Sequence, residues 1–177
     1  MLRRLVRHLR HRWFDPATLR RTITPALRAR LLQHIQQCEH GHTGQIRIVI
    51  ESGLPTTYLW RRATMPALVR QRALALFGKL QVWDTEHNNG VLVYLLLAER
   101  AIEIVADRGL DRQLSAADWQ AILQPMQLAF RAGHYEQGLQ AGLNALASQL
   151  RHHFPRPADQ SQANELPDAP VMDPASE

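Results

Sequence analysis

The stretch Val91-Leu92-Val93-Tyr94-Leu95-Leu96-Leu97 decides the fold class of this 177-residue chain. Its apolar side chains are too continuous for a strand with one exposed face, so they predict a central strand that is covered on both faces. The preceding residues His87-Asn88-Asn89-Gly90 have the composition of a turn. After a short connection, Ala101-Ile102-Glu103-Ile104-Val105-Ala106 returns as an antiparallel strand. The pattern therefore predicts a sheet.

Toward the N-terminus, Ile46, Ile48 and Ile50 alternate with residues of the opposite face, which predicts an earlier strand over 45–51. Apolar spacing of three and four residues predicts helices between the strands and after them. These helices span about 24–41, 65–80, 115–131 and 135–153, and Pro125 is expected to kink or restart the third. The alternation of helices and strands is typical of an α/β protein.

Charge and composition divide the chain into three expected parts. Residues 1–23 form a basic amphipathic helical segment, 24–154 form the α/β domain, and 155–177 form a mobile, acidic, proline-rich tail. Within the tail, Leu166 could still clamp onto the domain or await a partner. The formal net charge is +5, and twenty of the 21 basic residues are arginine. Cys38 is the only cysteine, so no intramolecular disulfide can form.

Several local motifs follow one another in a specific order. They are Thr43-Gly44-Gln45-Ile46-Arg47, Val82-Trp83-Asp84-Thr85, Asn88-Asn89-Gly90-Val91-Leu92-Val93-Tyr94, Glu103-Ile104-Val105-Ala106-Asp107-Arg108-Gly109-Leu110, Phe130-Arg131-Ala132-Gly133 and Asn164-Glu165-Leu166-Pro167-Asp168. In this order and spacing, residues 24–168 resemble the bacterial TPM-domain family, in its short cytoplasmic form without a transmembrane segment.

The resemblance implies a three-layer α/β/α sandwich around a small mixed sheet. Distant members include a thylakoid-lumen protein that is tied to photosystem repair. Weak acid phosphatase activity and calcium binding have been attributed to some members, and bacterial members often accompany a LemA-like membrane protein. The resemblance thus implies a role near the envelope, although the sequence predicts neither the signal nor the anchor of secreted relatives.

The expected topology brings polar residues from distant segments to one edge of the sheet. The helix between strands 45–51 and 91–97 makes them parallel, so their starts lie at the same edge as the end of strand 101–106. The residues expected there are His42, Asp84, Glu86, Asn88, Asn89, Asp107 and Asp111. Oxygen ligands of this kind suit Ca²⁺ or Mg²⁺, and Asp107, Glu86, Asp84 and Asn89 are the candidate metal ligands. The alternative interpretation is that Asn and Asp are simply turn residues.

Other chemistry is less well supported by the sequence. Cys38-Glu39-His40-Gly41-His42 contains zinc-ligand residue types, but a second cluster is missing, which favours a buried structural thiol at Cys38. Neither a Cys-x5-Arg loop nor a Gly-x-Ser-x-Gly elbow is present. A phosphatase would therefore have to be metal-assisted, with Asp107 or Glu86 holding the ion.

The N-terminal segment suggests a surface of another kind. Leu5, Leu9 and Trp13 share one helical face opposite Arg3 and Arg7, which fits a helix lying on an anionic membrane or contacting a membrane-associated protein. Alternatively, this face docks on the domain and the arginines are only solvated. Stacking aromatics do not interleave with the arginines, which argues against nucleic-acid binding.

Two functional hypotheses follow from these patterns. The first is a binding or adaptor module, modulated by a divalent cation and located in the cytoplasm or peripherally at the inner membrane. The second is a weak metal-dependent phosphatase. Because the sequence shows neither an activated nucleophile nor an acid/base pair, it favours the module.

Overall fold

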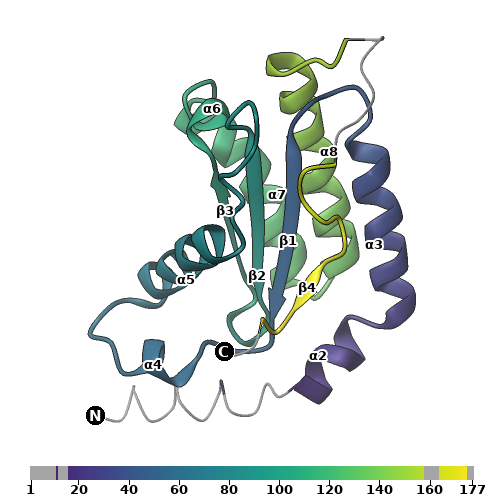
Figure 1. Cartoon of the computed structure of the whole chain (residues 1–177). Coiled ribbons are helices and arrows are strands. Elements are labelled where there is room, and N and C mark those ends of the chain that lie inside the picture. The colour runs from purple at the N-terminus through teal and green to yellow at the C-terminus, as the bar shows by residue number, and fades with distance from the viewer. Residues whose placement is uncertain (1–10, 12–15, 158–163, 175–177) are drawn as a thin grey trace.

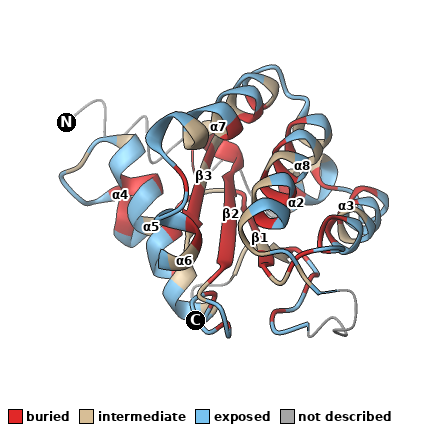
Figure 2. Ribbon diagram, turned by 90° about the horizontal axis from the view of Figure 1, so that it is seen from above, coloured by how far each residue is buried: buried red, intermediate tan, exposed pale blue. Residues whose placement is uncertain are grey.

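The computed structural model describes residues 11, 16–157 and 164–174, and it is a three-layer α/β/α sandwich. A mixed sheet lies in the middle, with α5 on one side and α3 and α8 on the other (Figures 1 and 2). The expected fold class is confirmed. The elements in chain order are α2 (Pro16–Thr22), α3 (Pro25–Cys38), β1 (Gln45–Glu51), α4 (Thr56–Leu59), α5 (Met65–Lys79), β2 (Gly90–Leu96), η1 (Leu97–Glu99), β3 (Ala101–Ala106), α6 (Arg108–Asp111), α7 (Ala116–Arg131), α8 (Tyr135–His153) and β4 (Val171–Met172).

The strand order across the sheet is β3-β2-β1-β4. β1 and β2 are parallel, as the helical connection between them predicts, and β2 and β3 are antiparallel. β4 was not expected: Val171 and Met172 pair in parallel with Val49 and Ile50 at the outer edge of β1. The sheet therefore has four strands where the sequence predicted three.

Both faces of the sheet are buried under helices, as the continuous apolar run of β2 predicts. One face packs Ile46, Ile48 and Ile50 against α2, α3, α7 and α8. The other face packs Val49 and Tyr94 against α4 and α5. All seven residues of β2 are buried, so this strand belongs to both cores and anchors the sandwich.

Local sequence signals set most helix boundaries. The side chain of Thr24 caps α3 by accepting a hydrogen bond from the backbone N–H of Leu27 at 3.2 Å. Ser115 and Asp118 form a reciprocal capping box at the start of α7. α7 does not restart at Pro125 but continues through it to Arg131, because packing on the neighbouring helix and sheet outweighs the loss of one backbone hydrogen bond.

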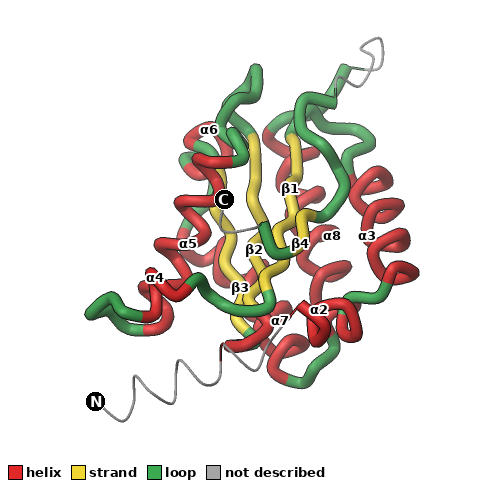
Figure 3. The backbone as a smooth tube through the Cα atoms, turned by 60° about the horizontal axis from the view of Figure 1, so that its bottom comes forward, coloured by secondary structure: helices red, strands yellow, loops and turns green. Residues whose placement is uncertain are grey.

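Part of the tail runs beside β1 as a strap, which we define as residues 164–174 (Figures 1 and 3). Leu166 is buried in the core on the α5 side, which corresponds to the first of the two alternatives for this residue, a clamp onto the domain. Over 164–174 the chain thus makes the contacts of a packed segment, which the description as a mobile tail did not foresee. These contacts are long-range, so local sequence patterns do not reveal them.

The N-terminal surface predicted from Leu5, Leu9, Trp13, Arg3 and Arg7 lies outside the described residues. His11 is described, and it is buried. Its ring Nδ1 accepts a hydrogen bond from the backbone N–H of Leu54, and its Nε2 lies 3.1 Å from Glu99 Oε1. No helix in the described part of the chain is long and apolar enough to span a membrane.

Candidate functional site

The turn before β2 and the end of β3 meet at the end of the sheet where β1 and β2 begin, as the topology predicts. We call this end of the strands the sheet edge of the candidate site. The backbone N–H of Asp107 donates to the carbonyl of Gly90 at 2.8 Å, and that of Gly109 donates to the carbonyl of Asn88 at 2.9 Å. A Cβ atom on Gly109 would lie only 2.4 Å from the Asn88 carbonyl oxygen. Glycine at this position therefore permits the close approach that joins the two segments.

Asp107 is the N-cap of α6. Its Oδ1 accepts the backbone N–H of Arg108 at 2.7 Å. Its Oδ2 is buried and has no hydrogen-bond partner among the described residues. A buried carboxylate oxygen without a donor is unusual in a folded protein, so this atom is available to a cation or a water molecule.

Asn89 also has a buried side-chain oxygen without a hydrogen-bond donor among the described residues. It is 1% exposed, its backbone N–H donates to Thr85 Oγ1, and its side-chain Nδ2 donates to Thr43 Oγ1 at 3.0 Å. The remaining atom of the amide, Oδ1, is buried without a partner in the described part of the chain. Two acceptor oxygens from adjoining segments of one sheet edge thus lack donors.

The other predicted ligands do not join a cluster of carboxylates. Asp84 and Glu86 are exposed in the turn. Within residues 11, 16–157 and 164–174, no group of three or more His, Cys, Asp or Glu side chains is arranged to hold a metal ion. The backbone N–H of Glu86 instead donates to Oε2 of Glu165 in the strap, at 2.9 Å. Sequence reasoning missed Glu165 as a neighbour of this turn, because only the return of the chain brings it there.

The remaining residues of the predicted edge have separate environments. Asn88 adopts a positive φ of 52° and accepts hydrogen bonds from the Arg108 guanidinium at 2.9 and 3.1 Å. Asp111 is exposed in α6. His42 is buried, and burial together with the nearby Arg151 lowers its pKa to about 4. The imidazole is therefore neutral at pH 7.

The donor set at this edge fits Ca²⁺ better than it fits a transition metal. Ca²⁺ accepts carboxylate, amide and backbone carbonyl oxygens together with water, so it tolerates an incomplete protein shell. Asp107 and Asn89 would supply the two unpaired oxygens, and carbonyls of the turn or water would complete the shell. Such a donor set, with a single carboxylate, is typical of weak sites.

The segment Cys38-Glu39-His40-Gly41-His42 does not form a zinc site with any third partner in the described residues. Cys38 is buried, and its thiol donates to Asn144 Oδ1 at 3.6 Å. Burial raises the pKa of the Cys38 thiol, so the reactive thiolate is disfavoured. Burial also raises the pKa of Glu39 to about 7.

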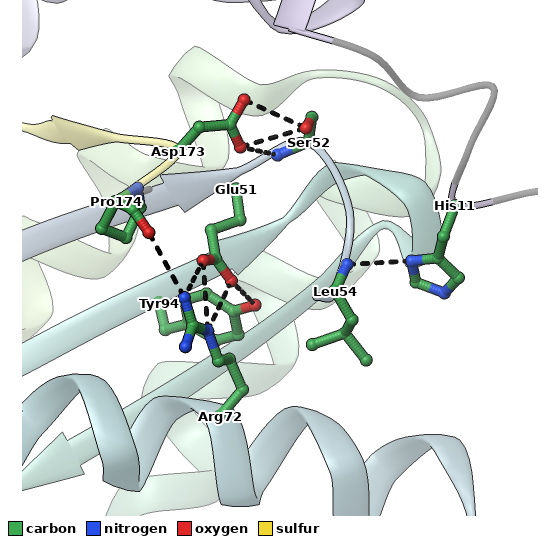
Figure 4. Close-up of polar contacts among 8 residues, drawn as sticks. All are labelled: His11, Glu51, Ser52, Leu54, Arg72, Tyr94, Asp173 and Pro174. Atoms are coloured by element: carbon green, nitrogen blue, oxygen red, sulfur yellow. Dashed lines mark hydrogen bonds and ion pairs between the residues drawn. The ribbon is translucent and has the colours of Figure 1, made fainter. Parts of the chain in front are cut away.

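A second group of charges lies at the opposite end of β1 and was not predicted. Glu51 is buried between Arg72, whose Nε lies 3.1 Å from both carboxylate oxygens, and Tyr94, whose hydroxyl donates to Oε2 at 2.6 Å (Figure 4). Burial, followed by the charge of Glu51, raises the pKa of Tyr94 well above its ordinary value. These groups satisfy one another, which indicates a structural role and not a reactive site.

Ser52 directly follows β1 and carries a hydroxyl group at the Glu51 end of this strand. Its Oγ lies 3.0 Å from each carboxylate oxygen of Asp173, which also accepts the backbone N–H of Ser52 at 2.7 Å (Figure 4). The imidazole of His11 is engaged with Leu54 and Glu99 instead. Ser52 therefore binds the strap, and among the described residues it is not paired with a histidine that could act as a general base.

The fold and the sheet-edge site define a class of small α/β/α sandwich with two parallel central strands and an antiparallel edge strand. The family model of the TPM domain matches residues 18–149, and the chain belongs to this family. The sequence matched no curated protein. The fold is similar to the NMR structure of the BA42 protein from the psychrophilic bacterium Bizionia argentinensis, with a TM-score of 0.67 and 26% identity over 81% of this chain and 90% of that one.

Proposed function

We propose that this TPM-domain protein is a binding module whose sheet edge at Asp107 and Asn89 takes a divalent cation, with Ca²⁺ as the preferred ion. The supporting observation is a pair of buried acceptor oxygens, Asp107 Oδ2 and Asn89 Oδ1, that find no donor among the described residues. A positive ion held between them would satisfy both, whereas each buried oxygen left unpaired costs about 1–3 kcal/mol.

The location of the site supports regulation more than catalysis. The turn that carries Asn89 also holds the strap, through the hydrogen bond between Glu86 and Glu165. An ion that orders this turn would therefore also stabilise the contact between turn and strap. The exposed carboxylates of Asp84 and Glu86 would attract cations to this edge without having to bind them directly.

Thermal unfolding in a Ca²⁺ titration tests the proposal. An ion that binds only the folded state stabilises it by about 2.7 kcal/mol at a hundredfold excess over Kd. For a domain of this size we expect Tm to rise by roughly 5–10 °C. Asp107→Asn should abolish the rise, and because asparagine also caps helices, the substitution leaves the start of α6 intact.

Asp111→Asn is the matched control. Asp111 lies in the same short helix but is exposed, so this variant should retain the Ca²⁺ effect. A wild-type Tm that does not change in Ca²⁺ or Mg²⁺ would overturn the proposal, as would an equal rise in the Asp107→Asn variant. Cation-dependent hydrolysis of a phosphate ester that Asp107→Asn removes would replace the module with a metal-assisted phosphatase.

A further inference from the structure

The strap is held by a row of side chains from a single strand. Gln45, at the start of β1, accepts the backbone N–H groups of Glu165 and Leu166 through Oε1, at 3.2 and 3.3 Å. Two residues further on, the Arg47 guanidinium donates to the carbonyls of Pro167 and Ala169. Side chains of β1 therefore bind backbone groups of the strap. Any extended segment has the same backbone groups.

β1 also contacts the strap at its C-terminal end. Val49 and Ile50 pair with β4, and the carbonyl of Ile50 accepts the backbone N–H of Asp173 at 2.9 Å. Ser52 then holds the Asp173 carboxylate through its backbone N–H and its hydroxyl. Main-chain pairing along a sheet edge, together with side-chain contacts at fixed intervals, is the mode by which sheets recognise extended peptides.

Side chains of the strap add specificity to this pairing. Leu166 is 7% exposed and inserts into the core on the α5 side, while Val171 and Met172 pack on opposite faces of the sheet. Asp168 is buried, and its charge lies near Arg47. In the strap, the contacts thus involve a leucine, two acidic residues and a short apolar pair at defined spacing.

We propose that the outer edge of β1 is a peptide-binding surface, that residues 164–174 are its resident ligand in cis, and that its partner is a protein presenting an extended acidic segment of the same pattern. Main-chain groups and carboxylates supply the contacts, so a segment from another chain could make them equally well. The covalent connection through residues 158–163 favours the resident strap by effective concentration. A partner would bind by replacing the strap.

The test uses the full chain with a protease recognition sequence in place of residues 158–163. After cleavage, the strap is attached by non-covalent contacts alone, and circular dichroism checks that the domain stays folded. A fluorescent peptide of residues 164–174 is then added, and its binding is followed by polarisation. We expect the labelled peptide to exchange into the cleaved protein, and an excess of unlabelled peptide to displace it.

Peptide variants distinguish specific recognition from adhesion. Leu166→Ala removes the buried side chain, and Asp173→Asn removes the charged acceptor of Ser52, so each should weaken binding about tenfold or more. Ala169→Gln alters an exposed side chain and keeps the carbonyl that Arg47 contacts, so it should bind within about twofold of the parent peptide. A cleaved protein that never takes up the peptide would overturn the proposal, and so would equal binding of all the variants.

Discussion

At the scale of single residues, Glu39 and His42 make opposite contributions to the pH dependence of stability. Burial raises the pKa of Glu39 from 4.5 to about 7, so its contribution is present below pH 4.5 and is lost as pH rises toward 7. Burial lowers the pKa of His42 from 6.5 to about 4, so its contribution is present above pH 6.5 and is lost as pH falls toward 4. Between pH 4.5 and 6.5 the two slopes largely cancel.

Glu39→Gln should remove one of the two opposing contributions to the pH dependence of stability. The glutamine keeps an oxygen for the backbone N–H of Ile46 but does not titrate. We expect the free energy of unfolding of the variant, relative to wild type, to rise by up to about 1.4 kcal/mol per pH unit between pH 4.5 and 6.5. Urea denaturation at several pH values measures it. His42→Gln should show a slope of the opposite sign, and a difference that is constant with pH in both variants would contradict this account.

A second prediction at this scale concerns the buried ion pair. Arg72→Met would leave the Glu51 carboxylate buried without its cation, which should lower the free energy of unfolding by about 3–5 kcal/mol. Arg70→Met breaks the more exposed pair with Glu103 and should cost about 1 kcal/mol or less. Chemical denaturation of the two variants provides the comparison, and equal losses would show that burial of the pair does not matter.

At the scale of elements, local signals predicted those parts of the fold that depend on neighbouring residues. The alternation of Ile46, Ile48 and Ile50 predicted β1, and apolar spacing predicted α3 and α7, whose starts are capped by Thr24 and Ser115. β4 lies between Pro170 and Pro174 and has two paired residues, too few for a periodic pattern. It is a strand only because β1 offers it a partner, and this information is not local.

The candidate site likewise contains residues that could be placed from the sequence and residues that could not. Asp107 and Asn89 could be placed at one edge because strand direction follows from the connections. Glu165 could not, since it reaches the turn only through the strap. The separation of Asp84 and Glu86 from a shared cluster could not be predicted either, because the conformation of a turn depends on contacts such as the close approach of Gly109 to Asn88.

The N-terminal segment yields a prediction at this scale. If the face formed by Leu5, Leu9 and Trp13 is free, deleting residues 1–10 should abolish co-sedimentation with anionic vesicles at low salt, because apolar burial and arginine charge act together. His11 remains in this variant, so its contact with Leu54 is kept. Equal sedimentation of the full-length and shortened proteins would show that the segment does not bind membranes.

At the scale of the whole molecule, the two ends of the parallel strands differ in whether their buried polar groups have partners. At the Glu51 end, buried charges satisfy one another, Arg72 also donates to the Pro174 carbonyl, and Asp173 is bound by the neighbouring Ser52 (Figure 4). At the Asp107 end, two acceptor oxygens have no donor within the part of the chain that the structure describes. The strap touches both ends, so an event at one end has a physical connection to the other. This asymmetry is the reason to place the ligand at the Asp107 end.

The most direct measurement of the central claim is a ¹H–¹⁵N correlation spectrum of the full chain during a Ca²⁺ titration. We predict saturable shifts concentrated in the amides of residues 84–90 and 107–109, with smaller changes at Glu165. In the Asp107→Asn variant these shifts should be absent. Shifts that are scattered over the acidic surface, that fail to saturate, or that persist in the variant would contradict a cation site at this edge of the sheet.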